Sequence, residues 1–221
     1  MKRHLFILIT FAGLFSSALA QETPPKEKGN FRSADLVEII KLDPTFKMDI
    51  RYATADNFTG QPVYNEARAF LQRPAAEALL RVHKKVKGKG YGLIIFDAYR
   101  PWSVTKLFWE RFPKFREYLA NPKKGSRHNR GCAVDLTLYD LKTGKEIQMP
   151  CPFDDFSERA DPYYNGGTSA QTKARDFLRT MMEAEGFKVF KNEWWHFDYK
   201  GWQEYPIMNL QFSEIAPTEI K

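Results

Sequence analysis

The stretch Ser126-Arg127-His128-Asn129-Arg130-Gly131-Cys132-Ala133-Val134-Asp135 runs from a polar loop into an apolar segment, which we expect to form a β-strand over residues 132–139. A second stretch, Glu193-Trp194-Trp195-His196, leads into another expected strand over residues 194–199. Together the two stretches offer two imidazoles and two carboxylates. A catalytic zinc ion is held by three nitrogen or oxygen ligands beside a carboxylate that moves protons. The two stretches therefore predict a zinc site built from two strands.

The spacing within each stretch indicates which residues hold the metal. His128 and Asp135 are seven residues apart, and on a straight strand an odd separation sends side chains to opposite faces. They converge only if the chain bends between them, and Gly131 permits such a bend. His196 then comes from the other strand. Glu193 lies three residues before it, so we expect Glu193 in the turn 191–193, reaching back as a base instead of a ligand.

A simpler interpretation exists for each residue taken alone. His-x6-Asp and Glu-x2-His are both weak signals, and His196 between Trp195 and Phe197 fits a buried, hydrogen-bonded histidine. The joint occurrence of both elements, with Gly131 where the bend is needed, favours the metal site.

The rest of the chain predicts the fold class. The apolar run 93–96 marks a buried central strand, Pro74 and Pro101 lie at helix starts, and Gly88 and Gly186 at helix ends. Adjacent strands indicate hairpins, so the class is α+β, with a mostly antiparallel central sheet and helices packed on it. We expect further strands at 36–40, 48–52, 91–98, 145–151 and 187–190, and helices at 74–87, 101–112 and 172–185.

Two cysteines, Cys132 and Cys151, remain to be placed. If residues 134–140 and 145–151 form a hairpin that turns at 142–144, the two cysteines approach each other. An oxidising compartment would permit a disulfide between them. The alternative is a pair of small buried thiols.

The junction Asp97-Ala98-Tyr99-Arg100-Pro101 ends the central strand and opens a helix. A side chain at such a junction projects into a site at the sheet edge. Arg100 is always charged and suits stabilisation of the oxyanion that forms when water attacks a carbonyl. The alternative is an ordinary ion pair between Arg100 and Asp97.

The first twenty residues have the features of a secretory signal peptide. Lys2 and Arg3 precede the apolar run 5–15, and Ala18-Leu19-Ala20 forms an A-x-A cleavage site. The run is shorter than the roughly 20 apolar residues of a membrane span, and no cysteine follows Ala20 for a lipid anchor. We therefore expect export to the periplasm or medium, no stable membrane anchor, and one mature domain over residues 21–221, with 21–30 as a flexible leader.

Charge adds little to the functional argument. The net charge of +7 becomes +5 once Lys2 and Arg3 are removed, a balance typical of a solvated surface. The basic cluster 84–89 has no nucleic-acid-binding motif beside it, and export argues against such a partner.

These residues resemble the VanX-type D-alanyl-D-alanine dipeptidases, which are zinc enzymes, over about residues 36–206. The His-x6-Asp element alone marks the wider clan of zinc D,D-peptidases, which includes carboxypeptidases and hedgehog-like domains, so the resemblance implies a hedgehog/D,D-peptidase-like fold. The resemblance rests on Arg51-Tyr52-Ala53-Thr54, Asp56-Asn57-Phe58-Thr59-Gly60, Tyr91-Gly92-Leu93, Asp97-Ala98-Tyr99-Arg100-Pro101, Ser126-x-His128-x-Arg130-Gly131-x-Ala133-x-Asp135-Leu136-Thr137-Leu138, Pro152-Phe153-Asp154 and Glu193-Trp194-Trp195-His196.

The resemblance implies a role for each matching residue. His128, Asp135 and His196 would bind one zinc ion. Glu193 would act as the general base and Arg100 would stabilise the tetrahedral intermediate. The resemblance also implies substrate-binding residues: Asp154 for the substrate ammonium, with Tyr52 and Ser126 lining the pocket. Asp155 stands beside Asp154 and is an alternative for its role.

The implied activity is hydrolysis of the D-alanyl-D-alanine dipeptide to free D-alanine. Such a substrate carries an ammonium and a carboxylate; Asp154 would meet the first, and Arg127, Ser126 or Tyr52 the second. Arg127 departs from the small polar residue of the best-known members. One alternative is therefore a D,D-carboxypeptidase or related peptidoglycan hydrolase acting on longer D-Ala-terminated stem peptides, with peptidoglycan fragments as partners. Another is a zinc-stabilised binding module without turnover.

Overall fold

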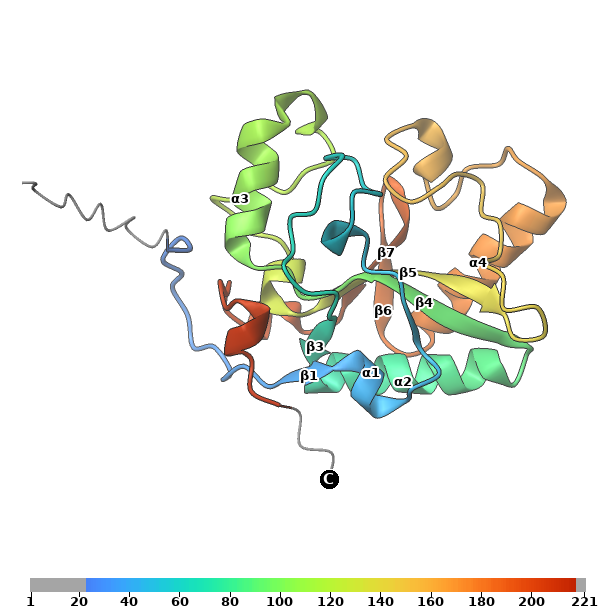
Figure 1. Cartoon of the computed structure of the whole chain (residues 1–221), viewed down its shortest axis with the longest axis horizontal. Coiled ribbons are helices and arrows are strands. Elements are labelled where there is room, and N and C mark those ends of the chain that lie inside the picture. The colour runs from blue at the N-terminus through green and yellow to red at the C-terminus, as the bar shows by residue number, and fades with distance from the viewer. Residues whose placement is uncertain (1–22, 218–221) are drawn as a thin grey trace, which may run out of the picture.

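A computed structural model of the chain describes residues 23–217 (Figure 1). The expected signal peptide and its cleavage site lie outside the described residues. The elements, in chain order, are β1 (Leu36–Glu38), α1 (Ile39–Leu42), β2 (Lys47–Met48), η1 (Arg51–Ala53), β3 (Phe70–Gln72), α2 (Arg73–Lys87), β4 (Tyr91–Asp97), α3 (Trp102–Arg111), η2 (Pro113–Phe115), η3 (His128–Arg130), β5 (Ala133–Asp140), η4 (Glu158–Ala160), α4 (Ser169–Glu183), β6 (Phe187–Phe190), β7 (Glu193–Tyr199), η5 (Trp202–Glu204) and η6 (Phe212–Glu214).

The central sheet has five strands in the order β2-β4-β5-β7-β6. Only β2 pairs in parallel, with β4, while the other neighbours are antiparallel. A separate two-stranded antiparallel sheet joins β1 to β3. The prediction of an α+β fold with a mostly antiparallel sheet is confirmed.

The two faces of the central strands differ in character. On β5, Val134, Leu136 and Leu138 belong to the main apolar core. Helices α2 and α4 pack on the sheet and on each other, and in Figure 1 α2 runs beneath the sheet. The alternate positions of β5, starting with Asp135, face the other way, because successive side chains in a strand point to opposite faces. We call the side that carries Asp135 the site face and the side that carries Leu136 the core face.

The helices follow the sequence signals closely, with one shift. Helix α2 has Pro74 in its first turn and ends at Gly88, as expected. Helix α4 begins earlier than predicted, because Thr168 and Gln171 form a reciprocal capping box at its start. It also ends earlier than predicted, at Glu183. Gly186 follows with φ of 88°, and its N–H donates to the Glu183 carbonyl.

Three predicted strands are wrong in whole or in part. The segment 36–40 is a strand only as far as Glu38, since its partner β3 is three residues long and leads directly into α2. The segment 48–52 leaves the sheet after Met48 and continues into a short 3₁₀ helix, η1. The segment 145–151 forms only an isolated bridge between Glu146 and Tyr139. Pro150 lacks the N–H that a longer ladder would need.

The two cysteines are therefore not joined by the expected hairpin. Cys132 and Cys151 are both free and buried, which matches the alternative of two small buried thiols. Burial raises the pKa of the Cys132 thiol to about 12 and that of Cys151 to about 11. Neither thiol is activated for chemistry at neutral pH.

The described part of the leader is tied to the fold instead of free. Glu27 forms an ion pair with Arg130 at 2.5 Å and accepts a hydrogen bond from the Ile207 N–H at 2.7 Å. Arg130 also donates to the Tyr205 carbonyl. The residues that were expected to be flexible thus reach the loop that carries His128. Within residues 23–217, no helix is long and apolar enough to cross a membrane.

Candidate active site

Three acidic or basic side chains lie side by side across the site face. In the strand register Asp97 of β4 lies opposite Asp135 of β5, which lies opposite His196 of β7. A register shift between Ile95 and Asp97 produces this alignment. Strand β4 has one more residue than β5 at this point, so Asp97 lies on the same face as Asp135. All three side chains are buried.

His128 reaches the same place from the loop before β5. Gly131 has φ of 67°, in the left-handed region, and its carbonyl accepts from the Gln72 N–H. This bend confirms the geometry expected from the odd spacing of His128 and Asp135. Two hydrogen bonds then fix His128 against the end of β4: its carbonyl accepts from the Arg100 N–H at 3.1 Å, and its Nδ1 donates to the Ala98 carbonyl at 2.6 Å.

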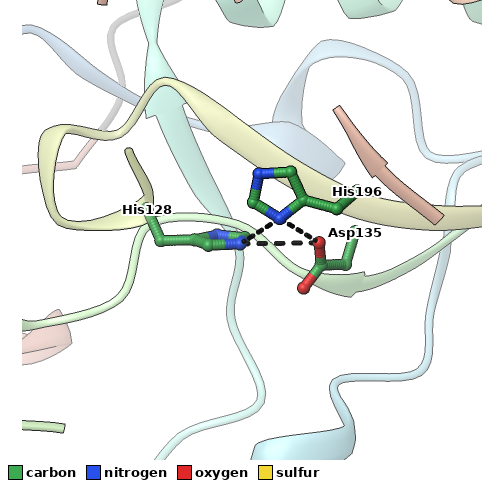
Figure 2. Close-up of side chains that lie close together, drawn as sticks. All are labelled: His128, Asp135 and His196. Atoms are coloured by element: carbon green, nitrogen blue, oxygen red, sulfur yellow. Dashed lines mark hydrogen bonds and ion pairs between the residues drawn. The ribbon is translucent and has the colours of Figure 1, made fainter. Parts of the chain in front are cut away.

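The three predicted metal ligands converge at a single point (Figure 2). His128 Nε2 lies 3.1 Å from His196 Nδ1 and 3.4 Å from Asp135 Oδ1. His196 Nδ1 lies 3.1 Å from the same carboxylate oxygen. All three atoms lie within 4.8 Å of one another, on buried side chains. The structure therefore groups the two histidines and the aspartate as the sequence predicted.

The donor set suits a zinc ion. Metal–ligand distances of 2.0–2.1 Å in a tetrahedral site place neighbouring ligand atoms about 3.3 Å apart, close to the separations here. The far nitrogen of each ring, the one that points away from the convergence point, forms a hydrogen bond. The partner of His128 Nδ1 is the Ala98 carbonyl, and the partner of His196 Nε2 is Asp198 Oδ1 at 2.9 Å. With each ring keeping its proton on that outer nitrogen, the two inner nitrogens would each offer a lone pair to a metal ion beside the Asp135 carboxylate. A cation between them would satisfy all three.

The charges at this point also call for a cation. Burial lowers the pKa of His196, but Asp198 and Asp135 outweigh it and raise that pKa well above its usual value. Burial raises the pKa of Asp135, yet His128 and His196 outweigh it and hold that pKa far below its usual range. Asp135 and Asp198 thus stabilise a positive charge where the three side chains converge, whether a proton or a metal ion supplies that charge.

Glu193 stands beside the ligands, as expected of a base. Its Oε2 lies 3.4 Å from His196 Nδ1. Glu193 is the first residue of β7 and not part of the preceding turn, so the predicted position was one residue off. A register shift between Val189 and Phe190 in the pairing with β7 accompanies this arrangement. Burial raises the Glu193 pKa to about 7, in the range where a carboxyl can both take and return a proton.

Arg100 takes part in an ion pair and also faces the cavity. Its Nε and Nη2 donate to Asp97 Oδ2 at 3.0 and 2.7 Å, which is the alternative that the sequence left open. Nη2 also lies 3.9 Å from Asp135 Oδ2, and the guanidinium packs over the Tyr52 ring at 5.1 Å. The Asp97 pair thus holds a positive charge at the edge of the predicted metal site.

Asp154 and Tyr52 meet in the lining of the same cavity. The Tyr52 hydroxyl donates to the two Asp154 oxygens at 3.3 and 3.2 Å. Asp154 has φ of 59°, a conformation that aspartate tolerates better than most residues. Burial, with Asp135 and Glu193 nearby, raises the Asp154 pKa well above its usual value. Asp154 lines the cavity, whereas its neighbour Asp155 is not among the lining residues.

These side chains surround a cavity of about 140 Å³. This is below the roughly 300–1,000 Å³ typical of pockets for drug-sized ligands, so the cavity suits a small molecule. Ser126 lines it and also accepts a hydrogen bond from the His128 N–H at 3.2 Å. The lining comprises Tyr52, Phe58, Arg100, Thr105, Phe108, Glu117, Tyr118, Leu119, Ala120, Ser126, Arg127, His128, Asp135, Asp154, Phe156, Phe190, Glu193, Trp195 and His196.

Sequence reasoning missed two residues that shape this site. Asn129 is fully buried and donates to the Arg100 carbonyl at 2.9 Å and to the Thr105 hydroxyl at 2.8 Å, so it joins the His128 loop to α3. Asp198 holds the far nitrogen of His196. The even spacing of His196 and Asp198 on one strand was the available signal, because it places both side chains on one face.

Comparisons with known proteins identify relatives of the chain. The family model described as D-ala-D-ala dipeptidase, peptidase M15, matches residues 32–216. The D-alanyl-D-alanine dipeptidase of Escherichia coli (strain K12) is 34% identical over 181 residues, covering 82% of this chain and 93% of that protein. The enzyme of the same name from Enterococcus faecium is 37% identical over 185 residues, covering 75% of this chain and 91% of that protein.

Solved structures give more distant matches. An LD-carboxypeptidase, LdcB, has a TM-score of 0.45 at 19% identity and covers 80% of this chain and 74% of that chain. A vancomycin-resistance D,D-pentapeptidase, VanY, in complex with Zn(II) has a TM-score of 0.38 at 16% identity and covers 61% of this chain and 75% of that chain. On the family match and the extent of the two sequence relatives, the chain belongs to the D-alanyl-D-alanine dipeptidase family of M15 metallopeptidases.

Proposed function

We propose that this protein hydrolyses the D-alanyl-D-alanine dipeptide to two molecules of D-alanine, with one zinc ion bound by His128, Asp135 and His196. The observation that carries the proposal is the convergence of these three buried ligands beside Glu193 in a small cavity. Family membership supports the same reaction. A bound zinc ion would supply Lewis-acid polarisation of the scissile carbonyl and would make water more acidic.

Glu193 moves the protons in this reaction. It takes a proton from the attacking water as the oxygen bonds to the carbonyl carbon. It then gives that proton to the leaving nitrogen as the C–N bond breaks, which yields a carboxylic acid and an amine. The proton of the acid then passes to the amine, so the products leave as a carboxylate and an ammonium. A Glu193 pKa of about 7 suits both steps, since it favours neither form strongly at neutral pH.

Arg100 would stabilise the negative charge that develops on the carbonyl oxygen. Burial lowers its pKa, but Asp97 and the neighbouring tyrosines outweigh this effect and keep the pKa well above its usual value. The guanidinium therefore stays charged throughout the reaction. Because Asp97 holds it in position beforehand, little reorganisation is needed when the oxyanion forms.

Asp154 and Ser126 would select a free dipeptide. The substrate ammonium would pair with Asp154, and that pairing would offset the burial that raises the Asp154 pKa. The Tyr52 hydroxyl supports Asp154 and is therefore less available for the substrate carboxylate. The Ser126 hydroxyl lines the same cavity and remains able to donate to that carboxylate.

One observation favours a second substrate class. A larger groove of about 670 Å³ shares Arg127 and Phe190 with the catalytic cavity and includes Lys188 and Lys200 in its lining. A basic groove beside the cavity would suit an acidic chain that continues beyond the cleaved residues. This is the alternative of a D,D-carboxypeptidase or related peptidoglycan hydrolase acting on longer stem peptides.

A hydrolysis panel separates the two. The zinc-loaded protein is incubated with D-Ala-D-Ala, with L,D- and L,L-dipeptides, with acyl-blocked D-Ala-D-Ala and with a D-Ala-terminated pentapeptide, and D-alanine release and zinc content are measured on each sample. We expect rapid cleavage of free D-Ala-D-Ala and little cleavage of the blocked or longer substrates. Cleavage of the pentapeptide with D-Ala-D-Ala left intact would contradict the dipeptidase proposal.

We also propose that the protein works outside the cytoplasm as one domain over residues 21–221. The features of residues 1–20 support this: a basic start, an apolar run and Ala18-Leu19-Ala20. Amino-terminal sequencing of the protein recovered from the periplasm or medium tests it. A mature terminus near Gln21 is expected, and retention of residues 1–20 in the cytoplasm would contradict it.

A further inference from the structure

The two histidines of the metal site are held by different partners. The far nitrogen of His128 donates to a backbone carbonyl, that of Ala98, at 2.6 Å. The far nitrogen of His196 lies 2.9 Å from a carboxylate oxygen, Oδ1 of Asp198. A carboxylate is the stronger acceptor, because it is charged. The position of the His196 ring therefore depends on a side chain that can be changed without altering the backbone.

Asp198 is built into the site face beside the ligands. It lies two residues after His196 on β7, in register with Ala133 of β5 and Lys188 of β6. Its side chain is 15% exposed. Oδ1 meets His196, while Oδ2 lies 3.5 Å from the Nε of Arg127. The carboxylate thus bridges a metal ligand and the arginine that precedes the other metal histidine in the chain.

Arg127 is itself held between aromatic rings. Its guanidinium packs over the Trp202 ring at 4.7 Å and near the Phe190 ring at 5.9 Å. The Phe190 ring in turn lies 5.2 Å from the His196 ring. Arg127 Nε is buried and makes no hydrogen bond within residues 23–217, and the Asp198 carboxylate lies 3.5 Å from it. This geometry turns Arg127 toward Asp198 as well as toward the cavity.

We propose that Asp198 is a positioning residue for the metal ligand His196, and that Arg127 braces Asp198 in that role. The inference rests on the proposed metal site. Asp198 holds the proton of His196 on Nε2, which leaves the Nδ1 lone pair directed at the metal position. Arg127, whose Nε lies 3.5 Å from the other carboxylate oxygen, keeps Asp198 oriented toward His196. In this protein the departure at Arg127 thus serves the metal site more than the substrate carboxylate.

The proposal predicts a graded loss of metal affinity. Removing an outer partner of a metal-bound histidine commonly weakens metal affinity by 10–100-fold. Asp198→Ala should therefore weaken zinc binding by about 100-fold, and Asp198→Asn, which keeps a neutral acceptor, by about 10-fold. Arg127→Ala should weaken it by about two- to fivefold, the range of a partly exposed ion pair.

The test measures the zinc dissociation constant of the full mature chain by competition with a chromophoric chelator. Wild type is compared with Asp198→Ala, Asp198→Asn, Arg127→Ala and the double variant Arg127→Ala/Asp198→Ala. The matched control is Arg179→Ala, because Arg179 also packs over an aromatic ring, Tyr163, at 4.5 Å and pairs with a carboxylate, Asp176, at 3.2 Å in α4. Thermal unfolding of the zinc-free proteins is recorded alongside.

The graded loss is expected without a matching loss of zinc-free stability in Asp198→Asn. If Arg127 acts through Asp198, Arg127→Ala should cause no further loss once Asp198 is alanine. Zinc affinity within twofold of wild type in both Asp198 variants would overturn the proposal. An Arg127→Ala variant that raises KM while zinc affinity stays unchanged would overturn the bracing role. A wild-type protein that binds no zinc would instead contradict the proposed function itself.

Discussion

The two faces of strands β4, β5 and β7 hold equally buried side chains of opposite character. On the core face Val134, Leu136 and Leu138 pack with the apolar residues of α2 and α4. On the site face Asp135 lies among two histidines and further carboxylates, with almost no exposure. Burial of apolar surface on the core face stabilises the folded protein. Burial of charged groups on the site face costs part of that stability, because these groups lose their contact with water. The charges are thereby held where a cation and a dipeptide would bind.

Two irregularities in the backbone create this difference. The register shift before Asp97 and the left-handed Gly131 each change which face a residue meets. A Cβ at position 131 would lie 2.6 Å from Leu36 Cδ2, so a larger residue there would displace the Leu36 side chain as well as strain the turn. The site therefore depends on places where the regular alternation of the strands is broken.

Glu193→Gln should give the largest effect. The amide cannot accept the proton from water, so D-Ala-D-Ala hydrolysis should fall by about a thousandfold, within the range of a lost general base. Zinc content and the unfolding temperature should stay close to wild type, since Glu193 is not a ligand. Steady-state rates and metal analysis on one preparation check both points. Full activity in this variant would show that Glu193 is not the general base of the reaction.

Removal of the metal should come next. Chelation should abolish hydrolysis, and added zinc should restore it. Because zinc would bind only the folded site, free zinc at 1,000 times its dissociation constant should raise the free energy of unfolding by about 4 kcal/mol. Chemical denaturation with and without zinc measures this difference. A protein whose stability and activity ignore both chelator and zinc would not have a metal centre at His128, Asp135 and His196.

On the core face, Leu136→Ala should cost about 2–5 kcal/mol of unfolding free energy, because a fully buried leucine leaves a cavity. Its turnover per folded molecule should stay near that of wild type, since Leu136 faces away from the ligands. Urea denaturation and active-site titration test the pair of expectations. A large fall in turnover at unchanged stability would show that the two faces are not independent.

His83, a histidine buried away from the site face, should show the smallest effect. It tests how burial of a histidine changes the stability of the protein. It is buried in α2 and stacks on Phe46, with the ring centroids 4.0 Å apart. Burial lowers its pKa to about 4, whereas the carboxylates around His196 have the opposite effect. Since the folded-state pKa lies below the unfolded value near 6.5, protonation favours unfolding. Stability should therefore fall as the pH drops from 6.5 to 4, by on the order of 1 kcal/mol after screening.

The measurement is unfolding free energy against pH for wild type and His83→Gln. The variant should have a flatter profile between pH 6.5 and 4. An equal slope in both proteins would assign that pH dependence to other groups.

The chemistry of the site was more predictable from the sequence than the path of the chain around it. His128, Asp135 and His196 could be grouped because strand periodicity and one glycine constrain where side chains point. The segment 48–52 was misassigned because local hydrogen bonds compete with the sheet. The side chains of Thr54 and Asn57 both donate to the Arg51 carbonyl, which favours a turn there. That turn positions Tyr52 beside Asp154.

Other features depend on contacts between distant segments and left little trace in the sequence. The pairing of Glu27 with Arg130 joins residues 103 positions apart. The role of Asn129 depends on the backbone carbonyl of Arg100 and the hydroxyl of Thr105, and no sequence spacing links either group to Asn129. Such polar contacts satisfy buried groups wherever the fold brings them together, so spacing alone does not reveal them.

Zinc content and D-alanine release, measured on the same samples of wild type and Glu193→Gln, test directly whether a bound zinc ion and Glu193 carry out the hydrolysis. We expect one zinc per chain in both proteins, release of two D-alanines per dipeptide by wild type, and almost none by the variant. Hydrolysis by metal-free wild type, or equal hydrolysis by the variant, would contradict this expectation.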